Sequence, residues 1–213
     1  ELLQGLTDCH VLGSGKHFPG LGGSSLDSHV NLPTVSRSWK QLWNHDLLPY
    51  RKLKSQLPFV MIAHCSYPAV TKDSTPASIS KKWLTDILRK KIGYRGIILS
   101  DDLDMGGVLA AASIEDAAIA CIRAGADSFL VCQKEESVSR AYEAVLHEAE
   151  RDRRFRALVE TAAKRIVAFK KRSPALKRKM ASPPDQKTID KLRQKNWTFT
   201  EEVRLAANRR LAM

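Results

Sequence analysis

Residues 96–102 read Gly-Ile-Ile-Leu-Ser-Asp-Asp, a short apolar run that ends in polar and acidic side chains. Three further apolar runs occur in the chain, at residues 10–12 leading into 16–18, at 59–63 and at 128–132. Each run is short and partly β-branched, which is typical of a strand buried on both faces of a parallel sheet. We therefore predict four strands, one at each run.

Helical patterns lie between these runs and after the last one. They cover residues 38–54, 80–91 and 113–124, and residues 135–171 form either one long helix or two packed helices. Ser80 is a suitable N-cap, and Gly125 stands where a C-terminal cap is expected. The alternation of strand and helix predicts an α/β fold with parallel strands and crossover helices.

Polar side chains stand at the carboxyl ends of three of the predicted strands. These are Lys16 and His17, His64, and the run from Ser100 to Asp102. In parallel α/β folds, catalytic and binding groups collect at that edge of the sheet. Lys16 and His17 are hydrogen-bond donors suited to holding hydroxyl groups of a substrate.

A glycine-rich loop follows the first predicted strand. Residues 19–23, Pro-Gly-Leu-Gly-Gly, allow close approach of the backbone to a ligand. Asp27 and His29 lie two residues apart, so in an extended loop both project to one side. An acid beside a histidine fixes its tautomer and raises its basicity, which makes His29 a candidate general acid/base. On spacing alone, a loop histidine next to a turn-forming Asp27 is the simpler interpretation.

The third predicted strand ends in three acids within four residues. Asp101, Asp102 and Asp104 would be costly to bury without partners. One can serve as a nucleophile, one as a structural acceptor and one as a helix N-cap. A metal site and a solvated turn are the alternatives, although a hard cation needs more oxygen ligands than this segment offers.

His64 is followed directly by Cys65, an order that suggests a catalytic histidine–cysteine pair. Nothing nearby in the sequence supplies an oxyanion hole. We therefore interpret His64 as a structural histidine.

Composition excludes several classes of protein. The 213 residues are 43% hydrophobic and 27% charged, as in an ordinary globular domain rather than a fibrous or disordered chain. No apolar run approaches the roughly 18 residues of a membrane span. The four cysteines form no CxxC pair, which argues against a zinc ribbon or disulfide scaffold and favours a reducing compartment, the cytoplasm.

The charge is concentrated at the end of the chain. Residues 151–213 hold 19 basic and 6 acidic residues, whereas residues 1–150 are close to neutral. We expect a domain over residues 1–172, a linker over 173–187 and a basic helical tail over 188–213. A basic tail can bind nucleic acid or anionic lipid. Because no recognised nucleic-acid motif accompanies the charge, we favour a solvated extension and do not expect a nucleic-acid partner.

Together these segments resemble the family 3 glycoside hydrolases, and within them the bacterial β-N-acetylhexosaminidases. The family's Lys-His-Phe-Pro-Gly-x-Gly stretch and its Asp-Ser-His appear at residues 16–22 and 27–29. The family's Ser-Asp-Asp-Leu-x-Met appears at residues 100–105. The resemblance runs over roughly residues 1–170, and its specificity comes from several motifs in the right order.

The resemblance implies a (β/α)8 TIM barrel and a retaining glycosidase that needs neither cofactor nor metal. Asp101 would be the nucleophile that forms a glycosyl-enzyme. His29 would act as acid and then base, with Asp27 orienting it, and Lys16 and His17 would bind the sugar. The expected substrates are N-acetylglucosamine-containing glycosides, such as the muropeptides of peptidoglycan recycling.

Two departures from the family pattern are visible. A histidine of the family's first motif is replaced by Leu21, which alters a loop contact. The chain also offers four strands, which correspond by family order to barrel strands 5–8, the C-terminal half, and residues 1–6 read like the end of a barrel helix. We therefore expect a fragment that requires an N-terminal half-barrel or associates with itself. The alternative is a catalytically incomplete remnant that binds sugars or anions.

Overall fold

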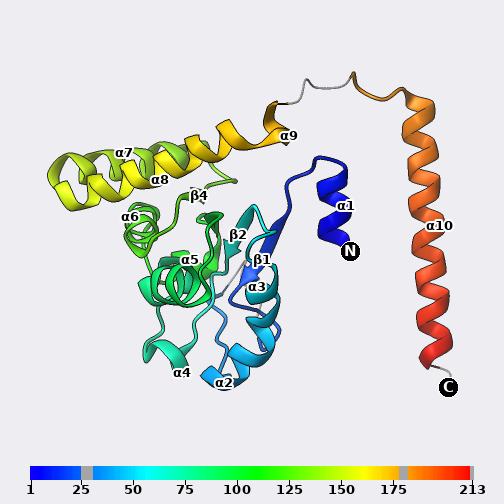
Figure 1. Ribbon diagram of the computed structural model, residues 1–213. Coiled ribbons are helices and arrows are strands. Elements are labelled where there is room, and N and C mark those ends of the chain that lie inside the picture. Colours follow the sequence, from blue (N-terminus) through cyan, green and yellow to red (C-terminus); the bar gives the residue numbers. More distant parts are fainter. Residues whose placement is uncertain (25–30, 178–181, 212–213) are drawn as a thin grey trace. The chain divides into compact units, whose positions relative to one another are not determined.

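The computed structural model describes residues 1–24, 31–177 and 182–211. Internal contacts divide the chain into two units, residues 1–177 and 178–213. The first unit contains the sheet and is described first. The second unit contains a single long helix among its described residues (Figure 1).

Four parallel strands form one sheet in the order in which they occur along the chain. They are β1 (Ser14–Phe18), β2 (Phe59–Ile62), β3 (Ile97–Asp102) and β4 (Ser128–Leu130), and each pairs with the next (Figure 1). All four predicted strands are confirmed, and so are the α/β class and its parallel pairing. Sequential parallel order with intervening helices is the construction of a TIM barrel, of which these strands are half the complement.

Two of the three strand pairs contain a β-bulge near the carboxyl edge. In the β1–β2 pair, Gly15 is opposite Val60 and Phe18 is opposite Ile62, so β1 holds one extra residue. In the β3–β4 pair, β3 likewise holds one extra residue between Leu99 and Asp102. A bulge redirects the side chains around it. The irregular positions are residues 16–17 of β1 and residues 100–101 of β3, which include His17 and Asp101.

Helices connect and cover the strands. In the first unit they are α1 (Leu2–Asp8), α2 (Trp39–Gln41), η1 (Leu42–Asp46), α3 (Leu48–Leu53), α4 (Pro68–Thr71), η2 (Ala77–Ile79), η3 (Lys82–Ile92), α5 (Gly106–Leu109), α6 (Ile114–Ala124), α7 (Glu135–Arg151), α8 (Arg153–Arg172) and α9 (Pro174–Lys177). The helix predicted over 38–54 is the almost continuous series α2–η1–α3. It starts with a capping box between Ser38 and Gln41.

The predicted helix boundaries have clear physical causes. Ser80 has an extended backbone, and its carbonyl accepts the N–H groups of Trp83 and Leu84, as an N-cap carbonyl does. Gly125 ends α6 with φ +110°, and a Cβ there would lie 2.5 Å from the hydroxyl of Thr85. Left-handed backbone and lack of space therefore both require glycine at position 125.

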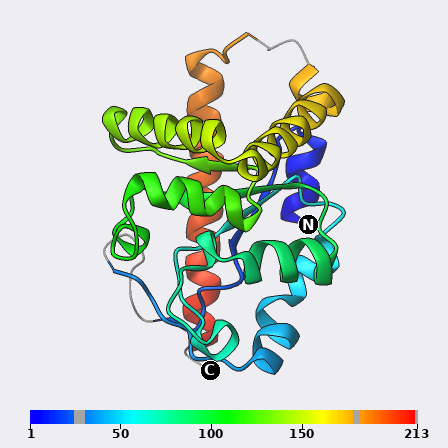
Figure 2. The ribbon, with the colours of Figure 1, turned by 90° about the vertical axis from the view of Figure 1, so that its left-hand side faces the viewer.

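Residues 135–171 form two helices rather than one. The break is at Asp152, whose carboxylate accepts the N–H groups of Arg154 and Phe155 and so caps α8. Helices α7 and α8 pack against each other and against α6 (Figures 1 and 2). Of the two alternatives left open by the sequence, the structure has the packed pair.

The core lies between the sheet and its helices. Its largest fully buried side chains include Trp83 of η3, Tyr67 before α4 and Phe18 of β1. The ring of Phe18 makes edge-to-face contacts with Tyr50 and Trp83. Phe18 directly follows His17, so this packing anchors the end of β1 beside the polar residues.

The second unit holds α10 (Gln186–Leu211), a 26-residue helix with mostly exposed side chains. The segment expected to be a linker begins with an ordered turn, because Pro174–Lys177 form α9 within the first unit. No described helix has both the length and the apolar character needed to cross a bilayer.

Candidate active site

Asp101 lies at the carboxyl end of β3, on the bulge of that strand. The Ser100 hydroxyl donates to the Asp101 carbonyl at 2.6 Å and accepts the Leu130 N–H at 3.2 Å, so it bridges the irregular part of the ladder. The Asp102 N–H donates to Oδ1 of Asp101 at 3.0 Å. The Asp101 side chain is 15% exposed. The carboxylate is therefore sheltered and held by the backbone, with one edge accessible.

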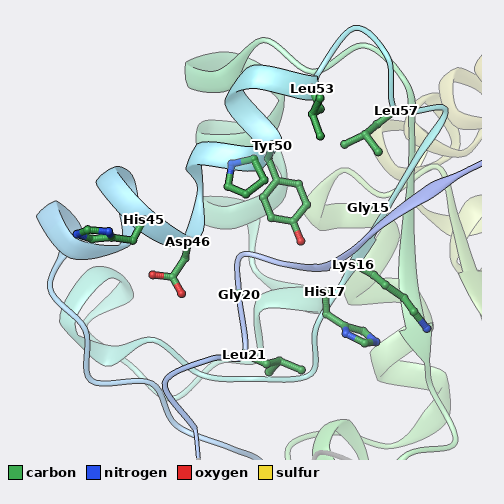
Figure 3. Close-up of a pocket in the computed structure, with 11 residues that line it drawn as sticks. Gly15, Lys16, His17, Gly20, Leu21, His45, Asp46, Tyr50, Leu53 and Leu57 are labelled. Carbon is green, nitrogen blue, oxygen red and sulfur yellow. The ribbon is translucent and has the colours of Figure 1, made fainter. Parts of the chain in front are cut away.

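His17 approaches that carboxylate from two strands away. Nε2 of His17, on β1, lies 3.5 Å from Oδ2 of Asp101 on β3. Lys16 is exposed beside it, and Figure 3 shows both side chains leaving β1 on the side opposite Tyr50. The structure thus brings together His17 and Asp101, two residues that the sequence placed only by their positions at strand ends.

The other two acids of the run serve the fold. Asp102 accepts hydrogen bonds from the N–H groups of Asp104 and Cys132 and from the side chain of Gln133. It is the structural acceptor that ties the end of β3 to the segment after β4. Within the described ranges, no three histidine, cysteine or acidic side chains are grouped so that they could hold a metal ion.

Asp104 caps a helix from a distance. Its carboxylate accepts the N–H groups of Gln133 and Lys134, directly before α7 begins at Glu135. Partial burial raises the pKa of Asp104, but hydrogen bonds from Ser137 and from those two N–H groups outweigh it and leave the pKa below its ordinary value. Nucleophile, acceptor and cap were the three roles expected for this run, and Asp102 and Asp104 occupy the latter two.

His64 lies fully buried between β2 and β3. Its Nε2 is 2.8 Å from the carbonyl of Asp102, and its Nδ1 is 2.7 Å from the hydroxyl of Ser78. A carbonyl only accepts, so Nε2 carries the proton and Nδ1 accepts from Ser78. This arrangement agrees with a structural histidine. His64 also has a role that the sequence did not indicate, because it holds the carbonyl of Asp102, the residue directly after Asp101.

Residues 20–22, shortly after β1, are held by close packing and polar contacts. Gly20 has φ +136°, and a Cβ there would lie 2.8 Å from Cβ of Asp46. The hydroxyl of Tyr67 donates to the Gly20 carbonyl at 2.9 Å. Arg37 contacts both Asp46 oxygens at 2.7 Å and reaches the Gly22 carbonyl at 3.3 Å. These partners could not be predicted, because they lie far from the loop in sequence.

A cavity of about 440 Å³ opens beside the end of β1 (Figure 3). Its lining includes Lys16, His17, Leu21, Asp46 and Tyr50. Asp101 is not among its lining residues. The cavity therefore reaches His17 but not Asp101. Leu21 contributes an apolar wall where the family motif has histidine.

Two predicted site residues lie outside the described residues. Asp27 and His29 belong to the segment 25–30, so their proposed roles remain predictions from the motif.

The chain is similar to known proteins over most of its length. Residues 1–169 match the family model of the glycosyl hydrolase family 3 N terminal domain. The β-hexosaminidase of Aromatoleum aromaticum is 44% identical over 135 residues, which are 63% of this chain and 37% of that protein. The β-hexosaminidase of Chromobacterium violaceum is 45% identical over 136 residues, 63% of this chain and 38% of that protein.

Solved structures give the same result. The family 3 β-N-acetylglucosaminidase from a Paenibacillus strain superposes with a TM-score of 0.81 and 31% identity, over 86% of this chain and 35% of that chain. This chain thus spans well under half the length of each of these relatives. The family model covers more than half of the residues, and the resemblance seen in the motifs is confirmed: the chain belongs to glycosyl hydrolase family 3.

Proposed function

We propose that this chain carries the nucleophile of a retaining glycoside hydrolase. The enzyme would release terminal N-acetyl-β-D-glucosamine from glycosides such as peptidoglycan fragments. Asp101 attacks the anomeric carbon and forms a glycosyl-enzyme, which water then hydrolyses. The β-hexosaminidase names of the relatives support this substrate class for the complete protein.

The pairing of His17 with Asp101 is the observation that carries the proposal. A nucleophilic carboxylate must be ionised, fixed in direction and open on one side. Asp101 accepts one backbone N–H on Oδ1 and faces His17 through Oδ2 at 3.5 Å. Lys16 and His17 leave β1 on the same side, where both can donate to sugar hydroxyls.

The contacts of Asp102 and Asp104 bear on which residue acts as the general acid/base. Retaining glycosidases ordinarily use a second carboxyl group about 5 Å from the nucleophile. Asp102 and Asp104 are the nearest acids in sequence, and both already accept backbone N–H groups. These contacts give both side chains a structural role. This supports the proposal that His29, oriented by Asp27, supplies the proton and later activates water.

We also propose that the enzyme acts in the cytoplasm. All four cysteines are free thiols, and Cys65 and Cys121 are buried. Unpaired cysteines are typical of a reducing compartment.

A chimera tests the function with a complete barrel. Residues 1–169 of this chain replace the matching segment of the Chromobacterium violaceum β-hexosaminidase, and hydrolysis of an aryl N-acetyl-β-glucosaminide is measured. We expect activity in the chimera and a loss of at least about 10³-fold on Asp101→Ala, because no glycosyl-enzyme can form. Asp86→Ala is the matched control, since it removes a half-exposed acid of η3.

Two outcomes would count against the proposal. A chimera with a native circular dichroism spectrum but no hydrolysis would show that this segment does not supply a working nucleophile. An Asp101→Ala chimera as active as the Asp86→Ala control would show that another group attacks the sugar.

A further inference from the structure

A second cavity lies on another part of the first unit, between η3, α6 and α8. It has a volume of about 560 Å³. Four cationic side chains line it, Arg89, Lys90, Arg95 and Arg165, together with the hydroxyl-bearing Thr85 and Thr161. None of its lining residues is acidic. It is close to the amino end of β3, which begins at Ile97, whereas Asp101 is at the carboxyl end.

One buried acid beneath the cavity organises part of this charge. Asp127 accepts hydrogen bonds from Arg89, from Nη1 of Arg165 at 2.9 Å and from the N–H of Ile98 at 2.9 Å. Its side chain is fully buried. Asp127 therefore holds two guanidinium groups in place and neutralises only one positive charge. Arg95 adds to this excess at the rim, whereas the charge of Lys90 there is balanced by Asp86 at 3.3 Å.

The positive surface continues beyond the cavity. A smaller hollow of about 220 Å³ shares Arg95 and Arg165 with it and adds Arg172. The side chain of Arg165 is 46% exposed although one of its guanidinium nitrogens donates to Asp127. Its remaining donors, and those of Arg95, are thus placed at the border of both hollows. Guanidinium groups match the oxygens of phosphate in geometry and charge.

We propose that the cavity lined by Arg89, Lys90, Arg95 and Arg165 binds a small molecule through its phosphate group. Its volume is within the usual range of roughly 300–1,000 Å³ for small-molecule sites. Thr85 and Ile122 at its walls can contact the rest of the ligand, whether that part is polar or apolar. A nucleic acid would follow a longer basic stripe than these two adjoining hollows form. The site does not depend on the proposed glycosidase activity.

Isothermal titration of the full 213-residue chain with pyrophosphate at low ionic strength tests this site. We expect one ion bound per chain, with affinity that falls as salt is added. Arg95→Gln and Lys90→Gln each remove one charge without touching Asp127. Each should weaken binding about tenfold, as expected for loss of a charged hydrogen bond.

A matched control is available in a third cavity, of about 590 Å³. It is lined by Arg151, Arg153 and Arg156 together with Glu150 and Glu160, so its charges are mixed. Arg153→Gln removes a single positive charge there and should leave pyrophosphate affinity unchanged. Equal weakening in Arg153→Gln would show non-specific attraction to a basic protein and would overturn the proposal.

Further outcomes separate this site from its alternatives. No heat of binding at millimolar pyrophosphate would refute it. Undiminished binding by the Arg95→Gln/Lys90→Gln double variant would also refute it and would move the site elsewhere, for example to the basic α10. Preferential binding of a DNA oligonucleotide, lost in the same double variant, would identify a nucleic-acid surface instead.

Discussion

At the scale of single residues, the acidic run after β3 shows how partners assign different roles to identical side chains. Asp102 is surrounded by donors from the segment after β4, and Asp104 accepts the N–H groups that precede α7. Asp101 alone of the three faces His17. An acceptor and a cap were predicted from the sequence as a set, and the nucleophile role of Asp101 stays a proposal. The sequence did not show which of Asp102 and Asp104 is the acceptor and which is the cap, because this depends on the position of residues 132–134.

Replacing Asp102 by Ala should destabilise the protein more than replacing Asp101 by Ala. Asp102→Ala removes the acceptor of the Asp104 and Cys132 N–H groups and of the Gln133 side chain, which costs about 1 kcal/mol of unfolding free energy. Asp102→Asn keeps an acceptor oxygen and should recover part of the loss. Urea denaturation of the three variants measures this. Equal destabilisation by Asp101→Ala and Asp102→Ala would contradict the division of roles.

His64 should make the protein sensitive to mild acid. Burial lowers the pKa of His64 below its ordinary value of 6.5, and the carboxylates of Asp101 and Asp102 oppose this only in part. Between the lowered pKa and 6.5, the unfolded chain binds a proton that the folded chain does not. Titration of His64 therefore leaves the free energy of unfolding unchanged above pH 6.5. Below that pH the free energy of unfolding falls, by at most about 1.4 kcal/mol per pH unit.

Urea denaturation at about pH 7 and about pH 5.5 measures this contribution. His64→Gln cannot titrate and keeps an amide donor for the Asp102 carbonyl. The variant should be less stable at pH 7 and should lose less stability on acidification. The same slope in both proteins would contradict a neutral, buried His64.

At the scale of elements, strands and helices followed from local patterns, whereas irregularities did not. The apolar run before Ser100 predicted β3, and the predicted cap at Gly125 ends α6. The β-bulges at residues 16–17 and 100–101 could not be predicted, because a bulge depends on the register between two strands. The division between α7 and α8 was open because both segments continue one helical pattern.

Asp152 should contribute to stability as the cap of α8. Asp152→Ala removes the acceptor of the Arg154 and Phe155 N–H groups and should cost about 1 kcal/mol. Asp152→Asn is the matched control, because asparagine caps helices about as well. Thermal denaturation of both variants distinguishes them. If Asp152→Asn lost as much stability as Asp152→Ala, the ion pair with Arg123 rather than the cap would be responsible.

At the scale of the whole molecule, the sheet of the first unit ends in two edge strands, β1 and β4. Beside β4, the apolar side chains of Val138, Tyr142 and Leu146 on α7 are 48%, 65% and 46% exposed. A hollow of about 380 Å³ between β4 and α7 is lined by Phe129, Val131, Val138 and Tyr142. Unpaired edges next to exposed apolar surface favour association.

We expect the purified chain to associate with itself. Analytical ultracentrifugation should show mass above 23.8 kDa at micromolar concentration. Tyr142→Lys should shift the distribution toward monomer if the surface beside β4 is involved, while Tyr142→Phe should not. A monodisperse monomer that unfolds in one cooperative step would contradict this expectation.

The most direct test of the central claim is to locate the covalent intermediate. The chimera is incubated with a 5-fluoro N-acetylglucosaminyl fluoride, a reagent that slows hydrolysis of a glycosyl-enzyme, and is then digested for peptide mass spectrometry. We expect one sugar bound to the carboxylate of Asp101, and no adduct in the Asp101→Ala variant. A sugar attached to Asp102, to Asp104 or outside residues 97–105 would contradict the assignment of the nucleophile.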